Sequence, residues 1–220
     1  MTADRGRETG RRSGVIGQLY GSRMKFRECF EYIASRRTKE LVVTSAGNCS
    51  EMWREVTHDS DGVFYLEASM SLASMFGTGI AVGVPQTPVW VFSGDGAFCM
   101  NPGMLMVEHQ MNLLNLKHFL VSNRCYGSTY EVRLPNASSN DYAAMARAVG
   151  IERVYRFDKL DSLKRDFDSA VLVPGHTFMV LEVEQVGKKL KEPPMEGPEM
   201  KYRFGRHIER LTGVRIFDES

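Results

Sequence analysis

The sequence predicts an α/β fold, a doubly wound and mostly parallel sheet with helices on both faces. Two observations lead to this prediction. Short apolar runs alternate with helical patterns through the body of the chain, which is typical of βαβ units. Four of the apolar runs pass directly into polar or glycine-rich segments, as expected where parallel strands end at one edge of a sheet. With 220 residues, 43% of them hydrophobic, the chain can bury a sizeable core.

The first half of the chain supplies the elements of one βαβ series. Aromatic and aliphatic residues at helical spacing predict a helix over about 23–36, and runs of Val, Leu and Phe predict strands at 41–44, 63–66 and 89–92. A short helix around 52–56 and a helix of small residues over about 70–82 are expected between these strands, and the glycines of the second helix imply close packing.

The second half continues the same alternation. Asn101 and Pro102 are read as the N-cap and first position of a helix that runs to about residue 114. Strands are expected at 119–121, 154–157 and 178–183, with helices near 142–149 and over 163–170. Pro193, Pro194 and Pro198 mark an exposed linker into a last amphipathic helix that ends near residue 211.

Composition divides the chain into three segments. Residues 1–22 are rich in Arg, Gly and Ser without periodicity, which indicates a flexible N-terminal tail; an Arg-rich start is also typical of transit peptides, but Asp4 and Glu8 argue against one. Residues 23–186 are expected to form one α/β domain. Residues 187–220 are expected to form a linker and a C-terminal helix that packs on this domain or on a partner.

Several classes of protein are disfavoured by composition. The net charge of +1 gives no electrostatic reason to expect nucleic acid or an anionic membrane as a partner. No segment approaches the roughly 20 apolar residues of a membrane span, and the N-terminus lacks the apolar core of a secretory signal. The four cysteines are widely spaced, which argues against a zinc site and a disulfide framework. We therefore expect a cytoplasmic protein.

The most informative pattern joins the ends of two predicted strands. The strand at 89–92 runs into Ser93-Gly94-Asp95-Gly96-Ala97, and the strand at 119–121 runs into Ser122-Asn123-Arg124-Cys125-Tyr126-Gly127. Glycines let backbone N–H groups approach an anion, and one carboxylate with a few neutral oxygens suits a Mg²⁺ ion that also binds phosphates. Gly-Asp-Gly alone is also a common turn. The second segment at this distance favours a magnesium-bound diphosphate.

Two other patterns do not indicate a binding or catalytic site. The segment from Gly77 to Gly83 does not match a dinucleotide-binding fingerprint, which needs glycine at position 82, where this chain has Val82. Its glycines also lie inside a predicted helix. The five histidines show no metal spacing and no paired nucleophile, so we assign them to the surface or to helix packing.

The two strand-end segments resemble the cofactor motif of thiamine-diphosphate enzymes, and the resemblance covers about residues 24–210. The segment 67–74 is similar to the one in which 2-oxoacid decarboxylases place a large apolar residue under the thiazolium ring, and Met70 falls at that position. Segments 123–129 and 193–206 most resemble the small, separately encoded subunit of sulfopyruvate decarboxylase and its relative phosphonopyruvate decarboxylase.

The resemblance implies a set of binding residues. Mg²⁺ would be bound by Asp95, by Asn123 and by the backbone carbonyl of Cys125, where the family usually has glycine, so this cysteine must avoid a positive φ. The thiamine diphosphate would be held by Asn48, Ala68, Ser69, Met70, Gly94, Gly96, Ala97 and Tyr126.

Simpler explanations remain for four of these features. By composition Met70 is a core residue. Asn48 and Ser50 could donate to the distal phosphate or cap the next helix. The thiol of Cys125 is read as a buried bystander and not as a nucleophile.

The resemblance also implies a partner subunit. The glutamate that activates the cofactor's pyrimidine ring belongs to a different domain in this family, and such a domain needs on the order of 150 residues, more than precede Met24. We therefore expect a heteromeric complex whose alpha subunit binds the pyrimidine and supplies this glutamate.

The implied reaction is non-oxidative decarboxylation of a small 2-oxoacid with an anionic head group. Thr129 stands where several single-chain decarboxylases have an acidic residue, so proton transfer would come from elsewhere. Three alternatives stay open: a carboligase of the acetolactate synthase kind, the beta subunit of a ferredoxin-linked oxidoreductase, which the scattered cysteines disfavour, and a non-catalytic scaffold or regulatory subunit.

Overall fold

The structure is a computed structural model that describes residues 23–59, 61–67, 69–188, 190–193 and 196–217, so the expected N-terminal tail lies outside it. Six strands form one sheet in which every pairing is parallel. Their order across the sheet is β2 (Val63–Leu66), β1 (Leu41–Ser45), β3 (Val89–Gly94), β4 (Leu116–Ser122), β8 (Thr177–Glu182) and β7 (Arg153–Phe157). The predicted α/β fold with a parallel sheet is confirmed.

The strand order reverses direction at the centre of the sheet. The chain passes from β1 outward to β2 and then returns to β3 on the other side of β1. Ligands of such open sheets bind outside the carboxyl ends of the strands at this switch point. The register of β3 and β4 pairs Gly94 with Val121, so Asp95 and Ser122, which follow them, lie side by side at the carboxyl edge.

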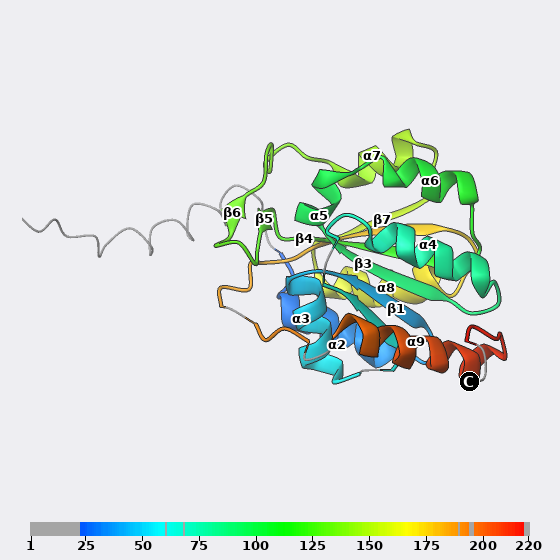
Figure 1. Ribbon diagram of the computed structural model, residues 1–220. Helices are drawn as coiled ribbons and strands as arrows, with labels where there is room; N and C mark the ends of the chain where they lie inside the picture. Colours follow the sequence, from blue (N-terminus) through cyan, green and yellow to red (C-terminus); the bar gives the residue numbers. More distant parts are fainter. Residues whose placement is uncertain (1–22, 60, 68, 189, 194–195, 218–220) are drawn as a thin grey trace, which may run out of the picture.

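One face of the sheet is covered by α2 (Phe26–Arg36), α3 (Asn48–Thr57) and α8 (Leu160–Val171). In Figure 1, α2 and α3 lie below the strands. Alternate strand residues point to this side because side chains on a strand alternate between faces. Phe92 stacks on Phe119 with ring centroids 4.6 Å apart, and Trp53 of α3 packs on Phe92 at 4.7 Å. This aromatic cluster ties α3 to the two strands that carry the predicted motif.

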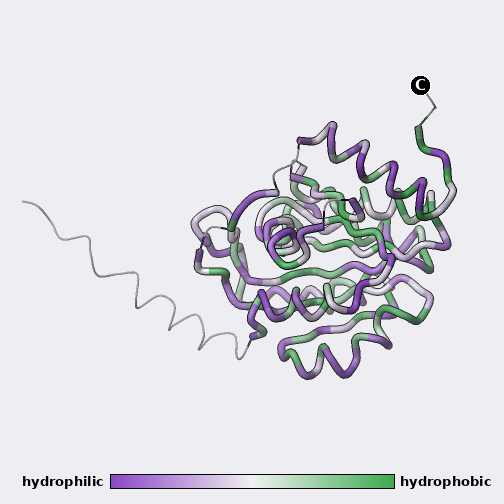
Figure 2. Tube along the Cα trace, turned by 90° about the horizontal axis from the view of Figure 1, so that it is seen from below, coloured by the Kyte–Doolittle hydropathy of each residue, from purple (hydrophilic) through white to green (hydrophobic). Residues whose placement is uncertain are grey.

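The other face is covered by α4 (Ala73–Gly83), α5 (Asp95–Met100), α6 (Met104–Met111) and α7 (Tyr142–Ala148). The strands themselves are mostly hydrophobic, as expected for strands buried on both sides (Figure 2). Gly77 confirms the predicted close packing, since a Cβ there would lie 2.2 Å from Cγ2 of Val91. Gly79 and Gly83 have open space instead.

The C-terminal helix α9 (Gly197–Thr212) lies along the free edge of β2. The backbone N–H of Tyr65 donates to Sδ of Met200 at 2.9 Å, and Phe204 and Ile208 pack into the core on the α4 side. The helix thereby covers an edge that would otherwise expose unpaired backbone groups. No helix among the described residues is long and apolar enough to cross a membrane.

Some predicted boundaries are wrong for local reasons. The helix expected from Asn101 to about residue 114 is α6, which is shorter and runs only from Met104 to Met111, with Gly103 as its N-cap. A separate helix that was not predicted, α5, precedes it, and Asn101 is the C-cap of α5. Pro198 lies in the first turn of α9 and not in the linker, since proline fits a first turn whose N–H groups have no helical partner. The two-residue strands β5 (Cys125–Tyr126) and β6 (Val132–Arg133) form a hairpin that is too short to show a sequence pattern.

Candidate functional site at the carboxyl edge of the sheet

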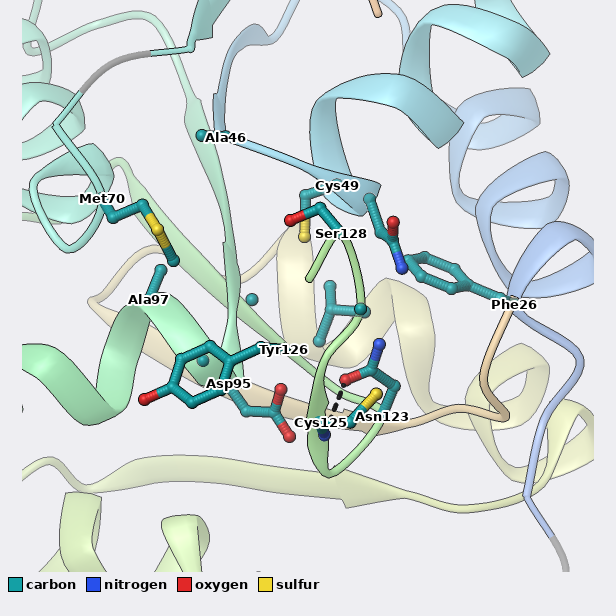
Figure 3. Close-up of a pocket in the computed structure, with 15 residues that line it drawn as sticks. Phe26, Ala46, Cys49, Met70, Asp95, Ala97, Asn123, Cys125, Tyr126 and Ser128 are labelled. Atoms are coloured by element: carbon teal, nitrogen blue, oxygen red, sulfur yellow. Dashed lines mark hydrogen bonds between the residues drawn. The ribbon is translucent and has the colours of Figure 1, made fainter. Parts of the chain in front are cut away.

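Segments that follow four neighbouring strands meet around one cavity of about 40 Å³ at the switch point (Figure 3). Residues after β1, β2, β3 and β4 all contribute, as the positions of the strand ends predict. Nine of the predicted site residues line the cavity: Asn48, Met70, Gly94, Asp95, Gly96, Ala97, Asn123, Cys125 and Tyr126. A cavity of this size holds only a few water molecules.

Asp95 is the charged group at this cavity. It is the first residue of α5 and is 1% exposed. Ser122 donates to its Oδ2 through Oγ at 3.0 Å, and the backbone N–H of Arg124 donates to the same oxygen at 2.7 Å. Burial raises the pKa of Asp95 to about 7, although both hydrogen bonds and the charge of Arg124 oppose the shift. An ionised carboxylate in this position is therefore under-compensated, and a bound cation would stabilise it.

Asn123 and Cys125 line the same cavity as this carboxylate and carry a neutral amide oxygen and a backbone carbonyl. Both are buried, and the backbone N–H of Cys125 donates to Oδ1 of Asn123 at 3.2 Å (Figure 3). The positive φ in this turn, 65°, belongs to Arg124 and not to Cys125. The cysteine therefore avoids the positive φ that a residue with a Cβ disfavours. Burial raises the pKa of the Cys125 thiol to about 12, which leaves the thiol neutral and a weak nucleophile at pH 7.

Two glycines allow the segments to close around the cavity. A Cβ at Gly96 would lie 2.7 Å from Cδ1 of Tyr126, whose ring covers this glycine. A Cβ at Gly127 would lie 2.2 Å from Nδ2 of Asn48. Gly94 differs, because its nearest neighbours would be 3.9 Å away and its N–H donates to Oγ of Ser45 at 3.0 Å.

Not every predicted residue reaches the cavity. Ser69 is exposed at a φ of 67° and is not part of the lining, and Ala68 lies outside the described residues. Ser50 is fully buried and donates to the carbonyl of Ser45 at 2.9 Å, so its hydroxyl is already committed. Asn48 is the first residue of α3, whose N-cap is Gly47, so the alternative in which Asn48 caps this helix is wrong.

Sequence reasoning missed six lining residues: Phe26, Ala46, Cys49, Val121, Gly127 and Ser128. Five of them lie in segments that follow or end β1 and β4, close to predicted positions, so the strand ends could have indicated them. Phe26 reaches the cavity from the start of α2, and no local pattern could have placed it there.

A wider groove of about 510 Å³ adjoins the cavity and shares Asn48, Gly127 and Ser128 with it. The groove is also lined by three carboxylates and one lysine, namely Glu51, Glu131, Glu192 and Lys188. Its charge is therefore predominantly negative.

The histidines lie away from this cavity. His118 and His176 are buried and pack against Glu108 of α6, with nitrogen to carboxylate distances of 3.0 Å, in agreement with their assignment to helix packing. Within the described part of the chain, no group of three or more His, Cys, Asp or Glu residues could hold a metal ion. A metal here would need the mixed carboxylate, amide and carbonyl set described above.

Comparison with known proteins points to one family. Residues 47–183 match the model of the thiamine pyrophosphate enzymes, C-terminal TPP binding domain. This range includes every lining residue of the cavity except Phe26 and Ala46.

The similar proteins match this chain over most of their own length or over about a third of it. The chain is 27% identical over 172 residues to sulfopyruvate decarboxylase subunit beta of Methanocaldococcus jannaschii, covering 78% of this chain and 90% of that subunit. It is 30% identical to phosphonopyruvate decarboxylase of Streptomyces viridochromogenes, covering 67% of this chain but only 36% of that enzyme. The crystal structure of benzoylformate decarboxylase from Polynucleobacter necessarius superposes with a TM-score of 0.61 at 18% identity, covering 77% of this chain and 34% of that chain.

Proposed function

Because this chain belongs to the thiamine pyrophosphate enzymes, we propose that it is the cofactor-binding subunit of a heteromeric 2-oxoacid decarboxylase, a lyase that is active only with its partner. The observation that carries the proposal is the cavity at the switch point, where Asp95, Asn123 and Cys125 come together within the segment that matches the family. Thiamine pyrophosphate and thiamine diphosphate are the same compound.

The residues at the cavity suit a magnesium-bound diphosphate. Mg²⁺ is usually held by one or two carboxylates, a few neutral oxygens and the phosphates of the ligand. Asp95 would supply the carboxylate, Asn123 its amide oxygen and Cys125 its carbonyl. The raised pKa of Asp95 supports this role, because it marks a buried carboxylate that lacks a full counter-charge.

The bound cofactor would supply an electron sink for a carbanion next to a carbonyl. The task of this chain is then to hold and shield it. Asn48 and the backbone of Gly96 and Ala97 would contact the diphosphate, and Met70 would lie beneath the thiazolium ring. The small cavity and the ring of Tyr126 over Gly96 support a further expectation, that the segment carrying Tyr126 moves aside when the cofactor binds.

Relative chain lengths support the need for a partner. The chain accounts for 90% of a protein named as a beta subunit but for only 36% of the phosphonopyruvate decarboxylase, which carries a further region. We propose that a separate alpha subunit corresponds to that region, binds the pyrimidine ring and contributes the activating glutamate.

The proposed substrate is a small 2-oxoacid with an anionic head group, as in the names of the similar decarboxylases. The acidic groove beside the cavity would repel such a head group. Its recognition would therefore rest mainly with the alpha subunit. The four cysteines are free, which supports a reducing compartment such as the cytoplasm.

Calorimetry with thiamine diphosphate and Mg²⁺, in the presence of the alpha subunit, tests the proposal. We expect saturable binding of thiamine diphosphate that requires Mg²⁺. Asp95→Ala should abolish this Mg²⁺-dependent binding, whereas the exposed Asp158→Ala should retain it. Absence of binding by the wild-type complex would leave a scaffold or regulatory role and overturn the enzymatic proposal.

A product assay then separates decarboxylation from carboligation. Sulfopyruvate alone should release CO₂ and the corresponding aldehyde. A carboligase would instead form a larger product when an acceptor aldehyde is added.

A further inference from the structure

On the basis of the proposed function, we propose that Arg124 is a positioning residue for the Mg²⁺ ligands and that it acts through Glu182. Arg124 lies between Asn123 and Cys125, two of the three proposed ligands. Its φ of 65° lies in the left-handed region, which favours glycine and disfavours residues with a Cβ. A long side chain stays in such a conformation only where its surroundings hold it there.

The guanidinium of Arg124 is clamped on the side away from the cavity. Nε donates to Oε2 of Glu182 at 3.2 Å, and Nη2 donates to Oε1 of the same carboxylate. Nη1 donates to the carbonyls of Ala137 at 3.3 Å and Asn140 at 2.6 Å. The guanidinium also lies over the ring of Tyr142, 5.0 Å from its centroid. Planar, bidentate contacts of this kind fix an arginine in direction as well as in position.

The backbone of Arg124 joins this clamp to the third proposed ligand. Its N–H donates to Oδ2 of Asp95 at 2.7 Å. The other donor to that oxygen, Ser122, is paired in register with Glu182 across β4 and β8. Asp95, Asn123 and Cys125 are therefore held by one frame, and the Arg124–Glu182 pair fastens the turn to the sheet.

The exact positions of these three residues are important for binding because Mg²⁺ requires nearly ideal octahedral geometry. A small rotation of the turn would move the amide of Asn123 and the carbonyl of Cys125 while leaving Asp95 in α5. Loss of a group that orients metal ligands commonly lowers metal affinity about 10- to 100-fold. We expect a loss of that size when the clamp is broken.

The chain contains a matched control for the clamp. Arg156 of β7 also binds Oε1 of Glu182, through Nη2 at 3.1 Å. Its side chain is 52% exposed, compared with 7% for Arg124, and it belongs to a different strand from the ligand turn. Replacing Arg156 removes one ion pair of Glu182 but leaves the turn that carries the proposed Mg²⁺ ligands unchanged.

The experiment is a Mg²⁺ titration by calorimetry of the full chain with its partner subunit at saturating thiamine diphosphate. Arg124→Lys, which keeps the charge but not the fork, and Glu182→Gln should each raise the Mg²⁺ concentration for half-saturation by about 10- to 100-fold. Arg156→Gln should stay within about twofold of wild type. Circular dichroism and thermal unfolding without Mg²⁺ verify that each variant is folded.

Arg124→Gly separates backbone strain from anchoring, because glycine adopts the positive φ freely but cannot form the clamp. We expect weak Mg²⁺ binding, and wild-type affinity in Arg124→Gly would overturn the proposal. So would wild-type affinity in folded Arg124→Lys and Glu182→Gln, since the clamp would then serve stability alone. If the wild-type complex itself does not bind Mg²⁺ with the cofactor, the proposed function fails, and this inference falls with it.

Discussion

Asp95 should make the isolated, metal-free chain less stable as the pH rises. The carboxyl is 1% exposed, and burial raises its pKa from 3.8 to about 7. Between these values the folded state holds more protons than the unfolded state, so the free energy of unfolding falls with increasing pH. Roughly three pH units, at about 1.4 kcal/mol each, amount to about 4 kcal/mol at pH 8. That is a large part of the 5–15 kcal/mol that is typical for a domain.

The perturbation is Asp95→Asn, which keeps the size and the acceptor oxygen but cannot ionise. Urea unfolding in EDTA between pH 4.5 and pH 8.5 should show this pH-dependent loss in the wild type and not in the variant. The variant should become the more stable protein at high pH, by up to about 4 kcal/mol. The exposed Asp158→Asn is the control and should stay within about 0.5 kcal/mol of wild type at every pH.

Adding Mg²⁺ and thiamine diphosphate should make the wild type more stable than Asp95→Asn at high pH. Saturating Mg²⁺ and thiamine diphosphate should stabilise the wild type most at pH 8, where Asp95 is ionised, and should stabilise Asp95→Asn little. The reasoning is refuted if wild type and Asp95→Asn lose stability in parallel across the whole pH range in EDTA. In that case the buried carboxyl would not be the group that titrates.

Two further predictions concern packing and charge away from the cavity. Glu108→Gln should lower the free energy of unfolding at pH 7 by about 3 kcal/mol, because two buried histidines hold the pKa of Glu108 down at about 2 against burial. The stabilisation by the ionised Glu108 is present above its ordinary pKa of about 4.5 and is lost as the pH falls towards 2. Urea unfolding at a series of pH values measures this stabilisation, and the exposed Glu152→Gln is the control. Gly77→Ala should cost about 1–3 kcal/mol by overpacking against Val91, whereas Gly79→Ala, which meets open space in the same helix, should be neutral or stabilise by up to about 1 kcal/mol. Thermal unfolding compares the two, and equal effects would contradict the packing described here.

Local patterns were sufficient for the elements with strong periodicity. The strand at Val63–Leu66 is predicted to the residue, and the other five strands of the sheet overlap their predicted ranges. They were readable because strands buried on both faces are continuous apolar runs. The short helix α5 was missed because its six residues, beginning at Asp95, place their three larger apolar side chains consecutively after glycine and alanine and show no helical period.

Site residues were predictable where they follow directly from a strand end. Asp95 and Asn123 each follow a buried strand, and parallel neighbours bring such positions to one edge. Ser69 shows the limit of this reasoning, because it is exposed with a positive φ although its neighbour Met70 lines the cavity. The direction of a loop depends on what packs against it, and no local pattern records that.

The sequence by itself determined the chemistry that this protein brings to its site: one carboxylate, one amide and glycines placed after buried strands. Only the tertiary structure decided how these groups are held. The order of β4 and β8 puts Glu182 beside Arg124, and the register of β3 and β4 puts Ser122 beside Asp95. Both contacts join residues far apart in the chain, so they depend on strand order and register, which arise when the sheet assembles.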